Sequence, residues 1–268
     1  MASFGKIAVM AGGALALGAL VLAERRRPLR TQHHSETGRI IANLALGAGC
    51  MAVVTAIEVP LTRAIARRNE AGGRGLAQKL PPRLQLAGAM LAMDYGFYIW
   101  HVMTHKVPFL WRFHRVHHVD PDMDMSTAVR FHPVDMLVSL PFRLVQVRLS
   151  GAGPRSLDLW RNFFNASVLF HHSNLRLPKQ WDERLSLVLT TPRMHGIHHS
   201  KLSAEQDSNW TSGFSFWDRL HGTFRAAPRN APPPDAIDIG VADWRALHDV
   251  PVVPALDSPF RAQPERVC

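Results

Sequence analysis

The sequence predicts an all-α integral membrane protein, and three observations lead to that fold class. Apolar residues make up 47% of the chain and gather in long blocks. Arginine-rich polar loops separate these blocks, as in proteins whose helices cross a bilayer. Histidines recur at spacings of three and four residues, which place side chains on one face of a helix.

Two uncharged segments come first, at residues 7–23 and 40–57. A helix over the first would span roughly 26 Å, just enough for a hydrocarbon core. A cleaved signal peptide is the alternative for this segment, but the arginine-rich run that follows is more typical of a cytoplasmic loop than of a cleavage site. Residues 60–83 are basic and rich in glycine and proline, which predicts a loop.

A third apolar segment begins at residue 84 and runs to His105. Asp94, Tyr98 and His101 share one face of this predicted helix with His105. An ionisable residue inside a membrane helix indicates a functional site. We expect Asp94 either to orient a ligand histidine or to form a helix–helix hydrogen bond. Pro108 should break the helix shortly afterwards.

The segment 119–135 is polar, and we expect it at the cytosolic surface. It contains His132, for which structural hydrogen bonding and metal contact both remain open. Two weaker apolar stretches, 136–149 and 157–170, flank a glycine- and proline-containing turn. They predict a helical hairpin that dips into the bilayer. The proline-rich remainder predicts a cytosolic tail laid over the domain.

Three histidine clusters carry the predicted chemistry. They are His101 and His105, then His114, His117 and His118, and finally His195, His198 and His199. On a helix, each cluster can aim its imidazoles at one point. Neutral imidazole suits iron, zinc, copper and nickel. Eight convergent histidines exceed the four ligands of a zinc site, so the clusters predict two metal ions, joined by one histidine of the pair 171–172.

The formal net charge is +10, which is compatible with nucleic acid or with anionic lipid. No recognised nucleic-acid motif accompanies the charge, so with apolar segments present we expect a bilayer as partner and no nucleic acid. The cysteines, Cys50 and Cys268, are far apart and predict neither a disulfide framework nor a cysteine metal site.

Several blocks resemble one known family. WRFHRVHH, STAVRFHPVD, FHHSNLRLP, TPRMHGIHHS, DSNW and FWDRLHGTF occur in the order typical of the bacterial branch of the fatty acid hydroxylase/sterol desaturase superfamily. The resemblance runs from about residue 20 to the tail. Two departures are Asn209-Trp210-Thr211, where the family usually has Asn-Tyr-Gly, and Val102, where arginine is common. The first departure is expected to reshape the loop beside the site.

The resemblance implies about four transmembrane or re-entrant helices with a cytosolic helical cap that carries a histidine-ligated dimetal site. It implies two iron ions, with zinc possible in a purified form, and O2-dependent hydroxylation or desaturation of a lipid. Electrons would come from a separate donor, a ferredoxin, a cytochrome b5-like protein or a reductase. Carried over by position, the metal ligands are His101, His105, His114, His117, His118, His172, His195, His198 and His199. His172 is preferred to His171, which stays open together with His132.

Asp94, Asn174 and Asn209 are expected to orient the metal ligands without contacting the metal themselves. We divide the chain into N-terminal membrane helices with basic loops (1–83), a histidine-box catalytic domain (84–224) and a proline-rich tail (225–268). The expected location is a bacterial inner membrane, crossed several times, with the histidines facing the cytosol. The lipid and the electron donor stay open.

Two other functions remain as alternatives. A membrane zinc hydrolase would need a general-base glutamate beside the ligands, as in HExxH, and the clusters contain none. A non-enzymatic metal-handling protein would need ionisable residues spread along a membrane pathway. Here the histidines instead concentrate after the third apolar segment.

Overall fold

Helices form the regular structure of the computed structural model, which describes residues 2–229, 236–243 and 245–263, with the backbone alone for 2–10. The long helices are α1 (Ala2–Arg26), α2 (Glu36–Val53), α3 (Val59–Ala71), α4 (Pro82–Lys106), α6 (Pro133–Ser150) and α7 (Pro154–His172). The short ones are α5 (Pro108–His118), α8 (Lys179–Leu185), α9 (Pro192–His198), α10 (Ser203–Gln206), α11 (Phe216–Leu220) and α12 (Val252–Asp257). Within the described ranges, extended backbone pairs only as isolated bridges, so the predicted all-α class is confirmed.

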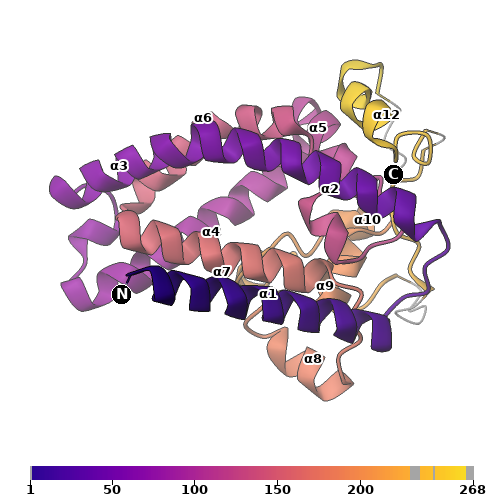
Figure 1. Cartoon of the computed structure of the whole chain (residues 1–268), viewed down its shortest axis with the longest axis horizontal. Helices are drawn as coiled ribbons and strands as arrows, with labels where there is room; N and C mark the ends of the chain where they lie inside the picture. The colour runs from indigo at the N-terminus through magenta and orange to yellow at the C-terminus, as the bar shows by residue number, and fades with distance from the viewer. Residues whose placement is uncertain (1, 230–235, 244, 264–268) are drawn as a thin grey trace.

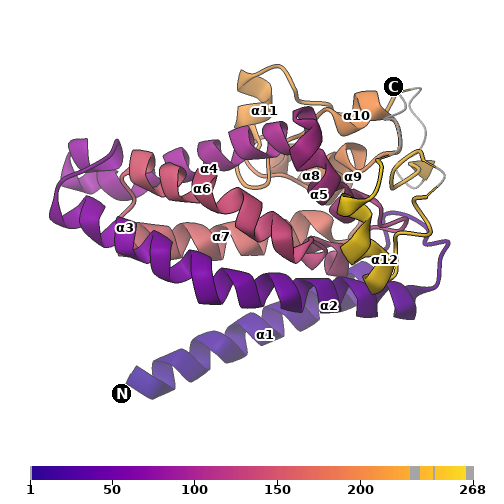
Figure 2. The same ribbon diagram turned by 90° about the horizontal axis from the view of Figure 1, so that it is seen from above.

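The long helices run roughly side by side, and the short ones gather at one end of them (Figure 1). In Figure 2, α1 diverges from the other long helices, while α2 and α3 form a continuous rod along one edge. A π-helical turn (Val54–Glu58) joins the two halves of this rod. Small buried side chains, Ala66, Ala89 and Ala152, let the long helices approach one another closely.

The rod 36–71 is the one described helix that is long and apolar enough, by length and composition, to cross a membrane. The prediction of a loop over 60–83 is wrong for residues 60–71, because α3 continues to Ala71. Pro60 does not interrupt the rod, because it lies two residues after the π-helical turn, where the regular pattern of backbone hydrogen bonds is already shifted. Asn69 then donates from Nδ2 to the carbonyls of Val147 and Ala152 and ties α3 to the α6–α7 turn.

The predicted break after His105 is confirmed. Val107 is extended, with φ −99° and ψ 115°, and α5 begins at Pro108. The two helices predicted on either side of the turn at 151–154 are also present, but they are longer than expected: α6 begins at Pro133 and α7 reaches His172. That they dip into the bilayer stays a prediction. Gly151 ends α6 in the left-handed region, with φ +73°.

The segment 119–135 corrects a second prediction, because it is buried rather than exposed. Asp120, Thr127 and Arg130 are each 0% exposed. The reason is pairing across the chain: Arg39 of α2 forms ion pairs with both Asp120 and Asp124. Cys50, a free thiol, donates to the carbonyl of Phe131 in the same segment. Cys268 lies outside the described residues, as does part of the predicted tail.

Replacing Gly151 with alanine should destabilise the protein more than replacing Gly73, although both have positive φ. A Cβ at Gly73 meets nothing within 4 Å, so Gly73→Ala carries only the backbone cost of about 1–2 kcal/mol. A Cβ at Gly151 would lie 2.8 Å from the backbone carbon of Gly75, which adds roughly 1–3 kcal/mol of overpacking. Thermal denaturation in detergent measures both, and equal shifts would contradict this account.

Candidate metal centre

All nine predicted ligand histidines come together at the end of the bundle where the short helices gather, and all are buried. They separate into two groups, and within each group the ligand nitrogens lie within 4.8 Å of one another. The five-histidine group contains His101, His105, His114, His118 and His198. The four-histidine group contains His117, His172, His195 and His199.

The division corrects the expectation that each HxxHH cluster aims at one point. In α5, His114 and His118 enter the five-histidine group, whereas His117 enters the other. In α9, His195 and His199 stay together and His198 separates from them. Helix geometry explains this, because residues i and i+4 differ by about 40° around the axis, while i+3 lies about 60° to the opposite side. Each cluster therefore supplies both groups.

Backbone carbonyls determine which ring nitrogen carries the hydrogen in several of these histidines. The Nδ1 atoms of His101, His117 and His198 lie 2.6, 3.1 and 2.9 Å from the carbonyl oxygens of Trp210, Arg130 and Ser208. His172 Nδ1 lies 2.8 Å from the carbonyl of Val168 in the same way. A carbonyl can only accept, so each Nδ1 carries the hydrogen and each Nε2 presents a lone pair. Sequence spacing gave no indication of these partners.

The lone pairs of the four-histidine group face each other. His117 Nε2 and His172 Nε2 are 3.0 Å apart, and His172 Nε2 and His195 Nε2 are also 3.0 Å apart. The first pair cannot hydrogen-bond, because both Nε2 atoms are acceptors. A cation bound to both removes the repulsion, and two nitrogens at about 2.1 Å from one ion, at right angles, lie roughly 3.0 Å apart. The donor set therefore fits a shared metal ion.

Burial keeps the rings neutral. It lowers the pKa of His118, His198 and His199 well below the ordinary histidine value, and neighbouring imidazoles lower it further. Both ring nitrogens of His118 and of His199 are buried without a hydrogen-bond partner in the described chain. Unsatisfied buried nitrogens are costly unless something binds them. Neutral imidazoles with free lone pairs are the form that binds iron or zinc.

Aromatic rings close the site. Trp210 is 2% exposed, and its ring lies 4.7 Å from that of His105 and 5.4 Å from that of His198, centroid to centroid. Phe131 stacks on His117 at 4.3 Å. Trp210 is one of the residues that depart from the family pattern, and it contacts the five-histidine group with its ring as well as its carbonyl. These rings therefore cover histidines of both groups.

The three residues expected to support the ligands form hydrogen bonds that hold separate segments of the chain together. Asp94 accepts from the Phe214 amide at 3.0 Å and from Trp217 Nε1 at 2.9 Å, so it ties α4 to α11 and its neighbouring loop rather than orienting a histidine. Asn209, with φ +50°, donates to the carbonyl of Met194, one residue before His195. Asn174 hydrogen-bonds the backbone of a loop residue, Arg30, accepting from its amide and donating to its carbonyl.

The two histidines left open differ in their surroundings. His132 uses both ring nitrogens structurally: Nδ1 accepts from the Val134 amide and Nε2 lies 3.0 Å from the Leu256 carbonyl. His171 is fully buried, and its ring centroid lies 4.0 Å from that of His195. His171 therefore packs against the four-histidine group, although it is not among the grouped ligands.

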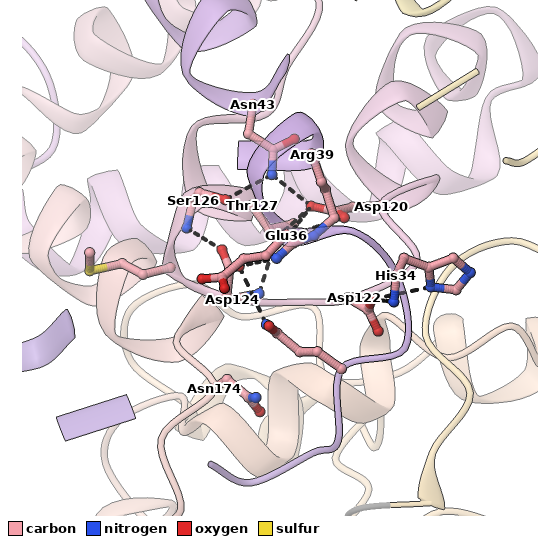
Figure 3. A network of polar contacts seen from close by, with 12 residues as sticks. His34, Glu36, Arg39, Asn43, Asp120, Asp122, Asp124, Ser126, Thr127 and Asn174 are labelled. Atoms are coloured by element: carbon pink, nitrogen blue, oxygen red, sulfur yellow. Dashed lines mark hydrogen bonds and ion pairs between the residues drawn. The ribbon is translucent and has the colours of Figure 1, made fainter. Parts of the chain in front are cut away.

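A buried polar network supports α5 from the α2 side (Figure 3). Arg39 and Asn43 point from α2 toward Asp120, which lies two residues after His118. Asp120 also accepts from Thr127 Oγ1 at 2.7 Å. Burial raises the pKa of the Asp124 carboxyl, but its ion pair with Arg39 outweighs this and leaves that pKa below the ordinary value. The network fixes the chain directly after the second histidine cluster.

Comparison with known proteins adds independent information. The family model described as fatty acid hydroxylase matches residues 86–223. Ornithine lipid hydroxylase OlsE of Rhizobium tropici is 29% identical over 230 residues, which cover 83% of this chain and 67% of that protein. Human alkylglycerol monooxygenase is 31% identical over 147 residues, 52% of this chain and 30% of that protein.

Human cholesterol 25-hydroxylase is 29% identical over 151 residues, which cover 52% of this chain and 50% of that protein. The chain thus spans about two thirds of the first relative and half or less of the other two. No solved structure matches the chain significantly. The matched region 86–223 contains all nine grouped histidines.

Proposed function

The chain belongs to the fatty acid hydroxylase family, and from that premise we propose that it is a membrane-bound non-haem di-iron oxygenase that hydroxylates a lipid C–H bond. The observation that carries the proposal is the pair of buried all-histidine groups. The names of the relatives, all hydroxylases or monooxygenases, favour hydroxylation over desaturation.

The residues of the chain perform defined tasks in this proposal. The five-histidine and four-histidine groups would each hold one iron, and the bound irons would supply O2 activation. The carbonyls of Trp210, Arg130 and Ser208 hold three of the rings with Nε2 directed into the groups. Trp210 and Phe131 exclude water, which protects a reactive oxidant from side reactions. Because imidazole is neutral, the filled site would stay cationic and oxidising.

A zinc hydrolase is the alternative from another class, and it would require a carboxylate base beside the ligands. Asp94, a buried carboxylate in α4, is committed to Phe214 and Trp217. In the described part of the chain, the grouped ligands are histidines alone. The geometry therefore supports the oxygenase better.

The membrane placement is part of the proposal. We place α1, the apolar part of the rod 36–71, α4, α6 and α7 in the bilayer, with the histidines at the cytosolic face. The Arg63–Asp158 ion pair then lies at the opposite water interface, because 36 helical residues span about 54 Å and exceed a hydrocarbon core of about 30 Å. The apolar composition of the rod supports this arrangement. Electrons would then reach the site from a separate donor, such as a ferredoxin, a cytochrome b5-like protein or a reductase.

Comparative lipid mass spectrometry tests the reaction. Cells that express the chain should contain a lipid with one oxygen more than its precursor, and cells without it should contain the precursor alone. A lipid that lacks two hydrogens would indicate desaturation instead. Unchanged lipids, together with no lipid-dependent O2 uptake by the iron-loaded protein and a reductase, would reject the oxygenase.

A further inference from the structure

A polar cavity of about 500 Å³ lies between the end of α1 and the beginning of α2. Its lining comes from residues 24–36, from Asp124 and from the segment after α7. The lining begins at exposed residues, since the side chains of Arg25 and Glu36 are 65% and 48% exposed. It ends at Arg30, which is 4% exposed. The cavity therefore leads from the surface to a buried arginine.

Arg30 lies against the metal centre. Its backbone is clasped by Asn174, which accepts from the Arg30 amide and donates to the Arg30 carbonyl, both at 2.8 Å. Its guanidinium touches α9, because a Cβ built on Gly196 would lie 2.5 Å from Nη1. Gly196 directly follows His195 of the four-histidine group. A ligand on Arg30 would thus be adjacent to that group.

No carboxylate forms an ion pair with Arg30 in the described chain, although Glu24 and Asp124 of the cavity wall lie close enough to stabilise its charge. Nη1 makes a long 3.4 Å contact with the carbonyl of Pro192, and the buried Nε and Nη2 have no hydrogen-bond partner. A buried guanidinium whose N–H groups lack acceptors is costly. Arg25 and Arg39, by contrast, have ion pairs with carboxylates. The geometry at Arg30 therefore calls for an acidic group from a ligand.

The cavity wall also contains carboxylates. Glu24 lies at its rim, with Oε2 accepting from the amides of Asn174 at 2.8 Å and Met125 at 3.2 Å. Three acidic side chains (Glu24, Glu36, Asp124) share the lining with three arginines (Arg25, Arg30, Arg176). A ligand with several negative charges would be repelled by this wall. A ligand with one acidic and one basic group would satisfy both kinds of side chain.

The cavity begins where an apolar surface ends. Leu15, Leu17 and Leu22 of α1 are 74%, 42% and 48% exposed, and Glu24 lies two residues after Leu22. An amphiphile could therefore lay its hydrocarbon chain along α1 and its headgroup in the cavity.

We propose that this cavity binds the zwitterionic headgroup of the lipid substrate, with its acidic group on Arg30 and its basic group at Glu24. The inference rests on the proposed lipid hydroxylation and specifies the substrate class. It places the substrate carbons next to the headgroup near the four-histidine group.

Calorimetric titration of the full-length protein in a neutral maltoside detergent tests the binding. The probes are Nα-lauroyl-lysine, with a carboxylate and an ammonium group, N-lauroylglycine, with the carboxylate alone, uncharged monolaurin, and inorganic phosphate. Nα-lauroyl-lysine should bind most tightly. Arg30→Gln should weaken its binding by at least about tenfold, as loss of one partner of a buried charge pair does. Arg63→Gln, at an exposed ion pair with Asp158, is the matched control and should change nothing.

Glu24→Gln tests whether Glu24 binds the basic group of the headgroup. It should weaken the binding of Nα-lauroyl-lysine and leave that of N-lauroylglycine unchanged. Phosphate binding as tight as that of the amphiphiles would mean an anion site without a lipid role and would overturn the proposal. Monolaurin binding that equals that of Nα-lauroyl-lysine would overturn it as well.

Stability without ligand distinguishes a binding role of Arg30 from a structural one. Because the buried Nε and Nη2 lack acceptors, Arg30→Gln should raise the melting temperature of the ligand-free protein by a few degrees, on the order of 2–4 °C. A lower melting temperature with unchanged binding would show that Arg30 is structural. The titration needs neither iron nor O2, so its outcome is independent of the proposed oxidation. Conversely, lipid hydroxylation that is unaffected by Arg30→Gln would leave the function intact and reject the headgroup site.

Discussion

Replacing His117 with alanine is expected to abolish lipid oxidation and to remove one metal ion per chain. His117 Nε2 lies 3.0 Å from His172 Nε2, so its loss leaves the four-histidine group with three ligands. Changes to residues that merely support a ligand cost about 10–100-fold in metal affinity or activity, and loss of a ligand should cost more. Metal analysis of the purified protein and O2 uptake with a reductase measure the two effects.

His198→Ala is the matched change in the other group, which would keep four of its five histidines. We expect it to lower the metal content as well, but to leave the ion of the four-histidine group in place. His248→Ala is the control, since its side chain is 59% exposed and contacts Asp249. Full metal content in both His117→Ala and His198→Ala would contradict the assignment of the two groups.

Replacing Asp120 with alanine should produce the largest loss of stability outside the metal centre, about 3–5 kcal/mol. The carboxylate is 0% exposed and accepts from Arg39 at 3.2 Å, from Asn43 at 2.8 Å and from Thr127 at 2.7 Å. Its removal leaves these donors buried with fewer acceptors, and Asp124 alone must then balance Arg39. Thermal or chemical denaturation in detergent measures the loss.

Asp158→Ala is the control for this prediction. Its ion pair with Arg63 has a similar length, 2.7 Å, but the two side chains are 42% and 48% exposed. Exposed pairs contribute about 0–1 kcal/mol, so this change should be nearly neutral. Equal losses for Asp120→Ala and Asp158→Ala would mean that burial of the Arg39 network does not matter.

Local spacing in the sequence was sufficient for the main apolar helices and for eight of the nine histidines. His172 followed from the family resemblance, and the helix over residues 60–71 could not be predicted from its basic composition. Spacing along a helix is a local property, and so the break at Pro108 and the facing of His101 and His105 could be predicted. The burial of 119–135 could not, because its aspartates are compensated by Arg39, some eighty residues earlier in the chain. The sequence of a polar segment does not indicate whether its charged side chains contact water or distant charged residues of the same chain.

The same limit applies to the site. The carbonyls that direct the histidine rings belong to loop residues such as Trp210 and Ser208, and a backbone oxygen leaves no signature in the residue type. In the sequence, Arg30 is one of several arginines in a basic loop. Only its burial against Gly196 distinguishes it from Arg25.

The division of both HxxHH clusters has a consequence for assembly. Because α5 and α9 each contribute to both groups, the first ion to bind fixes the rotation of both helices and so orders most of the second group. The entropy of ordering those side chains is then already lost before the second ion arrives. Loading should therefore be positively cooperative, with little of the one-metal form at half-saturation.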